Sequence, residues 1–421
     1  MKTFLDGLLH TEKLIADIVF MCENRIKPTY FTRAVNCKMT FNDLILFILN
    51  YVKKTLQLEL DLYFEKIKGV EYTITKQGFS QARQKVSHEA FVKMGDNIIT
   101  WYYGDDDFKK FNGYRLSSID ASILEVHNSE ELRKAFGYAE GKDVKLARAK
   151  ASCIYDIEND MILASEITKY TTGEREIAIK LIEKLKTLGL KNDLILFDRG
   201  YPSKDFIAYL ESSKIKYLMR VKVNSMTEFN LAQEPDQIIE IMVKGKPIKV
   251  RLLRFMLDSE IEEVLVTNLF DESLGIQEFK SLYFKRWGIE VKFDELKNKL
   301  QLQNFTGETE LAVKQDFYAS MYLANMAALA KNEVNEEITQ KNEDKDLKYK
   351  YQVNINILIG KLKDSLVLML LEDNTEKRTA MFRKIMDELH RNVVPIRPGR
   401  SSPRNMRGNA NKNTMNKKRS L

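Results

Sequence analysis

The segment 283–297, with the sequence YFKRWGIEVKFDELK, constrains the fold more than any other part of the chain. Its polar residues Tyr283, Arg286, Glu290 and Lys297 fall within one narrow arc if each helical residue turns about 100°. Beside that arc lies an apolar stripe of Leu282, Ile289, Phe293, Leu296 and Leu300. Such a stripe is typical of a helix that packs on a core. The pattern predicts a helix that buries one edge and presents a carboxylate, two cations and a phenol along the other.

An ordinary amphipathic helix with a solvated charged face is the simpler explanation of this pattern. The spacing Tyr-x2-Arg-x3-Glu-x6-Lys, however, resembles the signature of a large family of bacterial insertion-sequence transposases with an Asp-Asp-Glu active site. The resemblance implies that Glu290 is the third metal-binding carboxylate and that two aspartates precede it on strands. It also implies that Tyr283, Arg286 and Lys297 hold DNA phosphates, for which their side chains are suited.

Asp120 and Asp198 match the two remaining acids of this family. Asp120 lies in the strand-like segment SSIDAS, and Asp198 follows the apolar run LILF and opens the block Asp-Arg-Gly-Tyr. Ligand groups gather at strand ends in open α/β sheets. An ordinary turn or strand-terminal aspartate is the simpler explanation of each residue alone. The resemblance also implies that Arg199 contacts DNA, whereas Ala121 departs from the glycine that the family often has after its first aspartate.

Three carboxylates predict the chemistry of a hard cation. Mg²⁺ prefers oxygen ligands and keeps several waters, so a few acids and the substrate phosphates complete its coordination. Two such ions about 3.5–4 Å apart activate a water or a 3′-hydroxyl and stabilise the leaving oxygen. The resemblance therefore implies two Mg²⁺ ions, with Mn²⁺ able to substitute, on Asp120, Asp198 and Glu290. The 3 cysteines and 4 histidines are scattered, which argues against a zinc site or disulfides.

The predicted elements of the middle of the chain follow the order of a ribonuclease-H-like α/β core. Hydrophobic periodicity predicts three strands, then a helix, a strand, a helix and a strand. Their residues are 114–126, 147–157, 161–170, 174–188, 192–198, 203–213 and 216–223. A β-rich insertion is expected at about 223–269, where the family usually has one. The predicted fold class is therefore α/β, with a catalytic domain at 108–300 flanked by N- and C-terminal helical regions.

The N-terminal region 1–107 is predicted to be helical and to bind DNA. Two candidate helices precede a short one that Ser80 is expected to cap and that presents Gln81, Arg83 and Lys85. This order resembles a helix-turn-helix, in which such side chains reach base edges or phosphates. A plain helical bundle without a role in DNA binding is the alternative.

The C-terminal region 301–390 is predicted to be helical, and 391–421 to be a basic disordered tail. The tail contains nine Lys or Arg and no acid, in a chain of net charge +7. A basic tail on a nearly neutral body predicts a polyanionic partner. The apolar runs are too short to span a membrane, and the first residues make a poor signal peptide. We therefore expect a cytoplasmic protein without a membrane partner, and the resemblance implies that it is bacterial and associated with the nucleoid.

The resemblance implies a transposase that cleaves insertion-sequence ends and transfers them into target DNA. The expected partners are double-stranded transposon ends, target DNA and a second copy of the chain on the paired ends. A ribonuclease-H-like nuclease or resolvase without strand transfer is the enzymatic alternative. The non-enzymatic alternative is a transposase-derived DNA-binding protein that no longer cuts DNA. The presence of Asp120, Asp198 and Glu290 argues against this alternative. Whether a hairpin intermediate is formed stays open.

Overall fold

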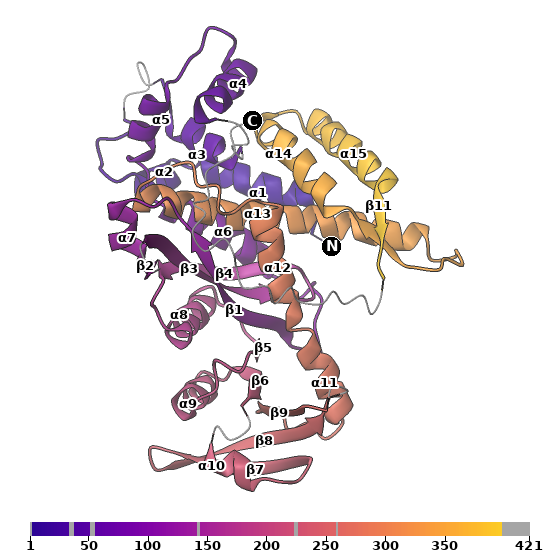
Figure 1. Cartoon of the computed structure of the whole chain (residues 1–421). Coiled ribbons are helices and arrows are strands. Elements are labelled where there is room, and N and C mark those ends of the chain that lie inside the picture. The colour runs from indigo at the N-terminus through magenta and orange to yellow at the C-terminus, as the bar shows by residue number, and fades with distance from the viewer. Residues whose placement is uncertain are drawn as a thin grey trace.

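The computed structural model describes residues 2–32, 38–50, 55–140, 144–222, 226–257 and 260–397. A nine-stranded mixed sheet runs through the lower half of the view in Figure 1, and helices from both ends of the chain gather above it. The strand order is β2-β3-β1-β5-β6-β9-β8-β7, and β4 pairs with β3 outside this path. The strands are β1 Arg115–Glu125, β2 Tyr138–Glu140, β3 Lys145–Asp156, β4 Met161–Lys169, β5 Asp193–Phe197, β6 Lys216–Val221, β7 Asp236–Val243, β8 Lys246–Met256 and β9 Glu262–Thr267.

The predicted α/β class is confirmed, and the predicted core elements occur in the predicted order. Strands β1, β3 and β4 pair antiparallel, whereas β5 and β6 run parallel to β1. The two helices between the later strands are α8 Glu174–Thr187 and α9 Lys204–Ser212. One short helix and one short strand between β1 and β3 were not predicted, namely α7 Glu130–Phe136 and β2.

The β-rich insertion continues the central sheet. After the short helix α10 Thr227–Leu231 come β7, β8 and β9, and β9 pairs antiparallel with β6. Arg251 of β8 fastens the insertion to the next segment, because its guanidinium binds the carboxylate of Asp236 at 2.5–2.7 Å and the carbonyls of Asp271 and Leu274. These contacts fix the start of α11 Ile276–Phe284, which carries the beginning of the signature.

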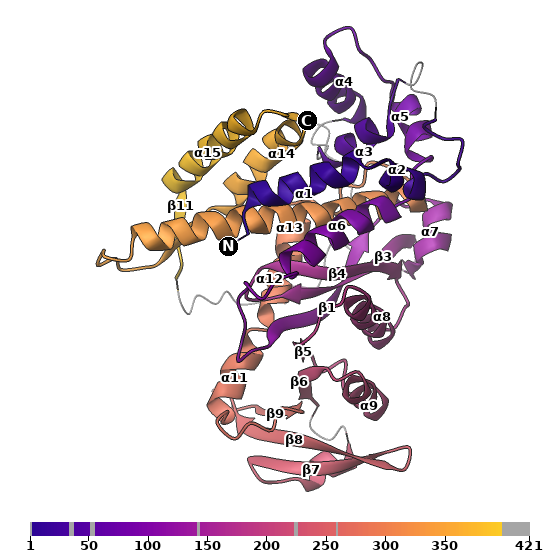
Figure 2. The same cartoon turned by 180° about the vertical axis from the view of Figure 1, so that it is seen from behind.

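The helical regions from the two ends of the chain form one layer around α13 Glu310–Lys341, a helix of 32 residues. Figures 1 and 2 both show α1 lying along α13 on the side away from the sheet. Asn325 attaches α13 to the sheet, since its amide accepts from Ile162 N at 2.7 Å and donates to Ile162 O at 2.9 Å. The remaining helices are α1 Phe4–Ala16, α2 Ile18–Asn24, α3 Phe41–Leu49, α4 Leu56–Lys68, α5 Lys76–Arg83, α6 Glu89–Tyr102, α12 Trp287–Asn298, α14 Ile355–Leu371 and α15 Thr375–Arg391.

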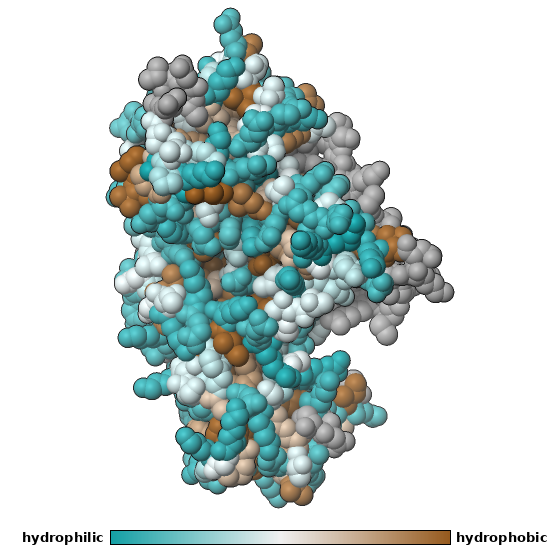
Figure 3. Space-filling view, turned by 90° about the vertical axis from the view of Figure 1, so that its left-hand side faces the viewer, coloured by the Kyte–Doolittle hydropathy of each residue, from teal (hydrophilic) through white to brown (hydrophobic). Residues whose placement is uncertain are grey.

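The ordered part of the chain extends further toward the C-terminus than predicted. Val393–Pro395 forms β11, which pairs antiparallel with β10 Tyr351–Val353, so the predicted disordered tail does not begin at 391. The tail from 398 onward lies outside the described residues. Within the described ranges, no helix is both long and apolar enough to cross a membrane. The face in Figure 3 is largely hydrophilic, with apolar side chains in small separate patches.

Candidate active site

The sheet register brings Asp120 and Asp198 to equivalent positions. β1 and β5 are neighbouring parallel strands in which Ser118 pairs with Leu196. Asp120 and Asp198 each follow their paired residue by two positions, and side chains two residues apart point to the same face of a sheet. Neighbouring strands lie about 4.8 Å apart. The two predicted aspartates therefore lie near each other at the carboxyl end of β5, where the charge of Asp198 raises the pKa of Asp120.

The electrostatic surroundings of Asp120 connect it to both other predicted acids. Burial raises the pKa of the Asp120 carboxyl to about 6. The Ala121 N–H, which donates to Asp120 Oδ1 at 2.8 Å, and the charge of Arg286 oppose this rise, whereas the charges of Asp198 and Glu290 increase it. Glu290 thus lies close enough to the two aspartates for its charge to be felt at Asp120.

The signature segment is two helices and not the single helix that was predicted. α11 ends at Phe284 and α12 begins at Trp287. Between them, the N–H groups of Lys285 and Arg286 bond to the carbonyls three residues earlier, at 3.1 and 3.0 Å. The backbone angles at both residues stay in the right-handed helical region, so the chain tightens into a 3₁₀ turn without reversing direction. The predicted apolar stripe remains buried, with exposed fractions of 0–6% for Leu282, Ile289, Phe293, Leu296 and Leu300.

The two helices divide the four signature residues, and Arg286 stands at their junction. Its guanidinium donates to Glu290 Oε1 at 2.9 Å and lies 5.8 and 5.3 Å from the ring centres of Tyr283 and Trp287. Its Nε–H is buried and has no hydrogen-bond partner among the described residues. Arg286 therefore orients Glu290, and its Nε–H could donate a hydrogen bond to a phosphate oxygen.

Lys297 and Tyr283 are both held against the core. The Lys297 ammonium donates to the carbonyl of Ile123 on β1 at 2.8 Å, and burial lowers its pKa. Burial raises the pKa of the Tyr283 hydroxyl, so this group stays neutral and can donate a hydrogen bond. The bond from Lys297 ties the C-terminal half of α12 to the strand that carries Asp120.

The loop after Asp198 is held by residues that the sequence did not single out. Asp198 Oδ1 accepts from Gly200 N at 2.5 Å. Arg175, at the start of α8, donates to the carbonyls of Tyr201, Gly200 and Pro202 at 2.8–3.3 Å. A Cβ at Gly200 would lie 3.0 Å from Asp198 Oδ1 and 3.3 Å from an oxygen of Glu174. Only the proximity in the fold reveals these roles, since Glu174 and Arg175 look like an ordinary helix start in the sequence.

The donor set of Asp120, Asp198 and Glu290 has the chemistry of a hard-cation site. All of its donors are carboxylate oxygens, the ligands that Mg²⁺ and Mn²⁺ prefer. Cys153, which pairs with Asp120 across the sheet, is fully buried, and burial raises the pKa of its thiol, so it offers no thiolate. Within the described ranges, no three Asp, Glu, His or Cys side chains stand close enough together to form a ready-made metal site. The residue types fit the cation, and the carboxylates would have to draw together around it.

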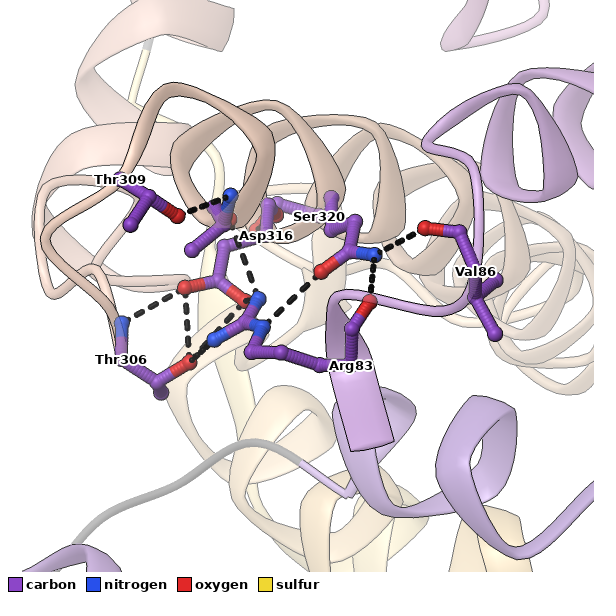
Figure 4. Close-up of polar contacts among 8 residues, drawn as sticks. Arg83, Val86, Thr306, Thr309, Asp316 and Ser320 are labelled. Atoms are coloured by element: carbon purple, nitrogen blue, oxygen red, sulfur yellow. Dashed lines mark hydrogen bonds and ion pairs between the residues drawn. The ribbon is translucent and has the colours of Figure 1, made fainter. Parts of the chain in front are cut away.

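Arg83 is buried, which corrects the prediction that the short helix presents it on its surface. Its side chain is 3% exposed and lies among polar groups at the start of α13, as Figure 4 shows. It donates to Gln315 Oε1 at 2.9 Å and to Thr306 Oγ1 and Asp316 Oδ1 at 2.8 Å. Gln315 in turn donates to the carbonyls of Arg83 and Val86 at 3.0 and 2.7 Å. Arg83 therefore joins α5 to α13 and to the loop that follows α12.

Of the other predicted DNA contacts, Ser80, Gln81 and Arg199 are exposed, whereas Tyr283 and Arg286 are buried. Thr75 caps α5 by accepting from Gly78 N at 3.1 Å, so the prediction that Ser80 caps this helix is wrong. Ser80 lies inside the helix and is exposed together with Gln81. Lys85 is half-buried. Arg199, in the loop after β5, is also exposed.

A family model and a solved structure are similar to this chain. A family model described as a transposase DDE domain matches residues 111–326, just over half of the chain, and this range contains all three predicted acids. No curated protein matches. The cryo-EM structure of a piggyBac transposase synaptic complex with hairpin DNA is similar with a TM-score of 0.49 and 12% identity, covering 94% of this chain and 87% of that one.

Proposed function

The chain belongs to the family of transposases with a DDE domain, and we propose that it cleaves the ends of a bacterial insertion sequence and joins them to target DNA. The observation that carries this proposal is the register of β1 and β5, in which the last pair, Ser118 and Leu196, precedes Asp120 and Asp198 by two positions each. The influence of Glu290 on the pKa of Asp120 supports it. In this proposal, β4, β3, β1, β5 and β6 with α8 and α9 are a ribonuclease-H-like core.

The catalytic residues in this proposal are the three carboxylates. Asp120, Asp198 and Glu290 would hold two divalent cations, Mg²⁺ or Mn²⁺, which supply an activated water or 3′-hydroxyl and neutralise charge at the scissile phosphate. The chain itself orients these ligands: Ala121 N holds one oxygen of Asp120, Gly200 N holds Asp198 and Arg286 holds Glu290. The acids are thus pre-positioned by backbone amides and one guanidinium.

The residues of the signature that surround Glu290 would bind the DNA strand at the site. The Nε–H of Arg286, which has no partner in the described part of the chain, and the neutral hydroxyl of Tyr283 are donors for phosphate oxygens. Lys297 would exchange its bond to the Ile123 carbonyl for a phosphate when DNA enters. Arg199 would contact the same DNA from the loop after β5. A homodimer on two paired ends, in the bacterial nucleoid, completes the proposal.

The enzymatic alternative, a nuclease without strand transfer, uses the same metal chemistry and differs in the fate of the 3′-hydroxyl. Holding that hydroxyl against a second phosphate can lower the barrier by about 7–11 kcal/mol when the geometry is good. We expect duplex ends with free 3′-hydroxyls to be joined to a target plasmid by the purified protein. Lys297→Ala should impair this joining more than first-strand nicking.

Lys285→Ala is the matched control, because Lys285 lies close by in the sequence but pairs with Glu158. It should leave the ratio of joining to nicking unchanged. A wild-type protein that nicks ends but joins none with either Mg²⁺ or Mn²⁺ would support the nuclease instead.

A further inference from the structure

A cluster of three cations around one tyrosine lies beside the exposed face of α5. We call Arg25, Lys27, Tyr30 and Lys85 the Tyr30 cluster. The ammonium groups of Lys27 and Lys85 lie 5.8 and 5.7 Å from the centre of the Tyr30 ring. Arg25 donates to the Tyr30 carbonyl at 3.3 Å. Two ammonium groups from separate segments of the chain therefore share the Tyr30 ring, and the Arg25 guanidinium binds the backbone of the same residue.

The backbone fixes these two segments against each other. The segment after α2 and the segment after α5 form an antiparallel bridge between Arg25 and Val86. Ile26 N donates to Lys85 O at 2.9 Å, and Ser87 N donates to Asn24 O at 2.8 Å. The cations of the Tyr30 cluster are therefore held close together before any partner arrives, which lowers the entropy cost of binding.

The positive charge of the cluster is not neutralised by the described part of the chain. Neither Lys27 nor Lys85 has an ion pair with a described residue, and the Nε–H of Arg25 is buried without a partner. Glu23, the acid nearest to Arg25 in the sequence, is engaged elsewhere, since it pairs with Lys93 at 2.7 Å. Cations that the fold brings together and leaves without acids fit a polyanion.

The neighbouring face of α5 suits the same partner. Lys76, Gln77, Ser80, Gln81 and Gln84 are exposed along this helix, and residues 76–88 contain no acid. Hydroxyl, amide and ammonium groups of this kind bind phosphates and base edges. Duplex DNA carries about one charge per 1.7 Å of helix axis, so ammonium groups that share one ring lie within reach of neighbouring phosphates.

We propose that the Tyr30 cluster is a docking site for the phosphate backbone of duplex DNA, which orients the DNA that lies on α5. This proposal rests on the proposed function in that it deepens the DNA-binding role of the N-terminal region. Lys27 and Lys85 contact the phosphates, Tyr30 spaces the two ammonium groups, and Arg25 fixes the tyrosine and contributes charge. The cluster adds affinity for all duplex DNA and does not itself read sequence.

The test is the salt dependence of binding to a random-sequence duplex of about 40 base pairs, measured by fluorescence anisotropy in EDTA. Each neutralised phosphate contributes about 0.9 to the slope of log K against log salt concentration. Lys27→Gln with Lys85→Gln should therefore flatten the slope by about 1.8. Lys27→Arg with Lys85→Arg keeps the charges and should restore the wild-type slope.

A double variant elsewhere controls for the loss of charge alone. Lys180→Gln with Lys314→Gln removes the same charge from lysines that pair with Glu176 and Glu310. Its slope should change by less than half as much. If the Lys27 and Lys85 double variant does not fold, Lys27→Gln alone, on an exposed side chain, should flatten the slope by about 0.9.

An unchanged slope in the folded Lys27 variants, or an equal change in the control, would overturn the proposal. Because EDTA prevents cleavage, this result is independent of catalysis. A protein that shows the predicted slopes but never cuts or joins DNA would contradict the proposed function and leave the docking site standing.

Discussion

Lys292 is expected to be the ionic anchor of α12, the helix that contains Glu290. It lies two residues after Glu290 but on the core side, where its side chain is 1% exposed. Its ammonium donates to Asp160 Oδ1 at 3.0 Å and to Glu295 Oε1 at 2.9 Å. Asp160 also accepts from Tyr155 at 2.8 Å and from Lys331 at 2.6 Å. The network thus joins α12 to α13 and to the turn between β3 and β4.

The perturbation is Lys292→Met, which keeps most of the length of the side chain and removes its charge. Removing one partner of a buried ion pair costs about 3–5 kcal/mol, because the remaining charge is left uncompensated. Lys331 still neutralises part of the charge of Asp160, but Glu295 loses its ammonium partner. We therefore expect the free energy of unfolding to fall by about 3 kcal/mol, near the lower end of that range.

The assay is urea unfolding followed by fluorescence, with Lys285→Met as the matched control. Lys285 pairs with Glu158, but its side chain is 41% exposed, and an exposed pair contributes about 0–1 kcal/mol. The Lys292 variant should also lose cleavage activity at temperatures where it remains folded, because α12 carries Glu290. A loss of stability no larger than that of the control would refute the role of Lys292 as an anchor.

Three further predictions follow from the contacts around the site. Burial alone would raise the pKa of Asp160, but Lys292 and Lys331 hold this pKa below its ordinary value. Asp160 therefore contributes stability above its unfolded pKa of about 3.9. In urea unfolding, the difference in stability between wild type and Asp160→Asn should be constant above about pH 5 and shrink below about pH 4. Gly200→Ala should slow cleavage about tenfold to a hundredfold by displacing the Asp198 carboxylate, whereas Gly95→Ala, where a Cβ meets nothing within 4 Å, should cleave like wild type. Arg175→Lys should slow cleavage at saturating DNA and raise the concentration of Mg²⁺ needed for half-maximal rate. The reason is that one ammonium cannot replace the guanidinium that binds three carbonyls. An unchanged Mg²⁺ requirement would show that Arg175 does not position Asp198.

Hydrophobic periodicity was sufficient to predict the core strands and helices. The short apolar run that ends at Phe197 indicated a buried parallel strand, and Asp198 stood out as an acid at its end. Periodicity could not show that the signature segment is interrupted, because a 3₁₀ turn at Lys285 and Arg286 barely changes the direction of the side chains. Periodicity also could not show that Ser118 pairs with Leu196, which brings the two aspartates together, because the register between two strands is set by the sheet.

Charged residues that the fold buries were the hardest to interpret from the sequence. Arg83 stands among polar residues of a short helix and was therefore expected on the surface. Its partners Gln315 and Asp316 are more than 200 residues away in the chain. Lys292 similarly looks like part of a solvated helix face in the sequence, but in the structure it binds Asp160 and Glu295. Long-range ion pairs of this kind leave no local pattern, so only the tertiary structure shows them.

Metal-dependent cleavage by carboxylate-to-amide variants tests the central claim most directly. Asp120→Asn, Asp198→Asn and Glu290→Gln remove one charge each and keep the size of the side chain. Affinity for DNA comes mainly from phosphate contacts, so each variant should bind the insertion-sequence end almost as tightly as wild type. Each should fail to cleave that end with Mg²⁺ or Mn²⁺ under single-turnover conditions. A variant that cleaves as fast as wild type would exclude its residue from the active site and contradict a three-carboxylate mechanism.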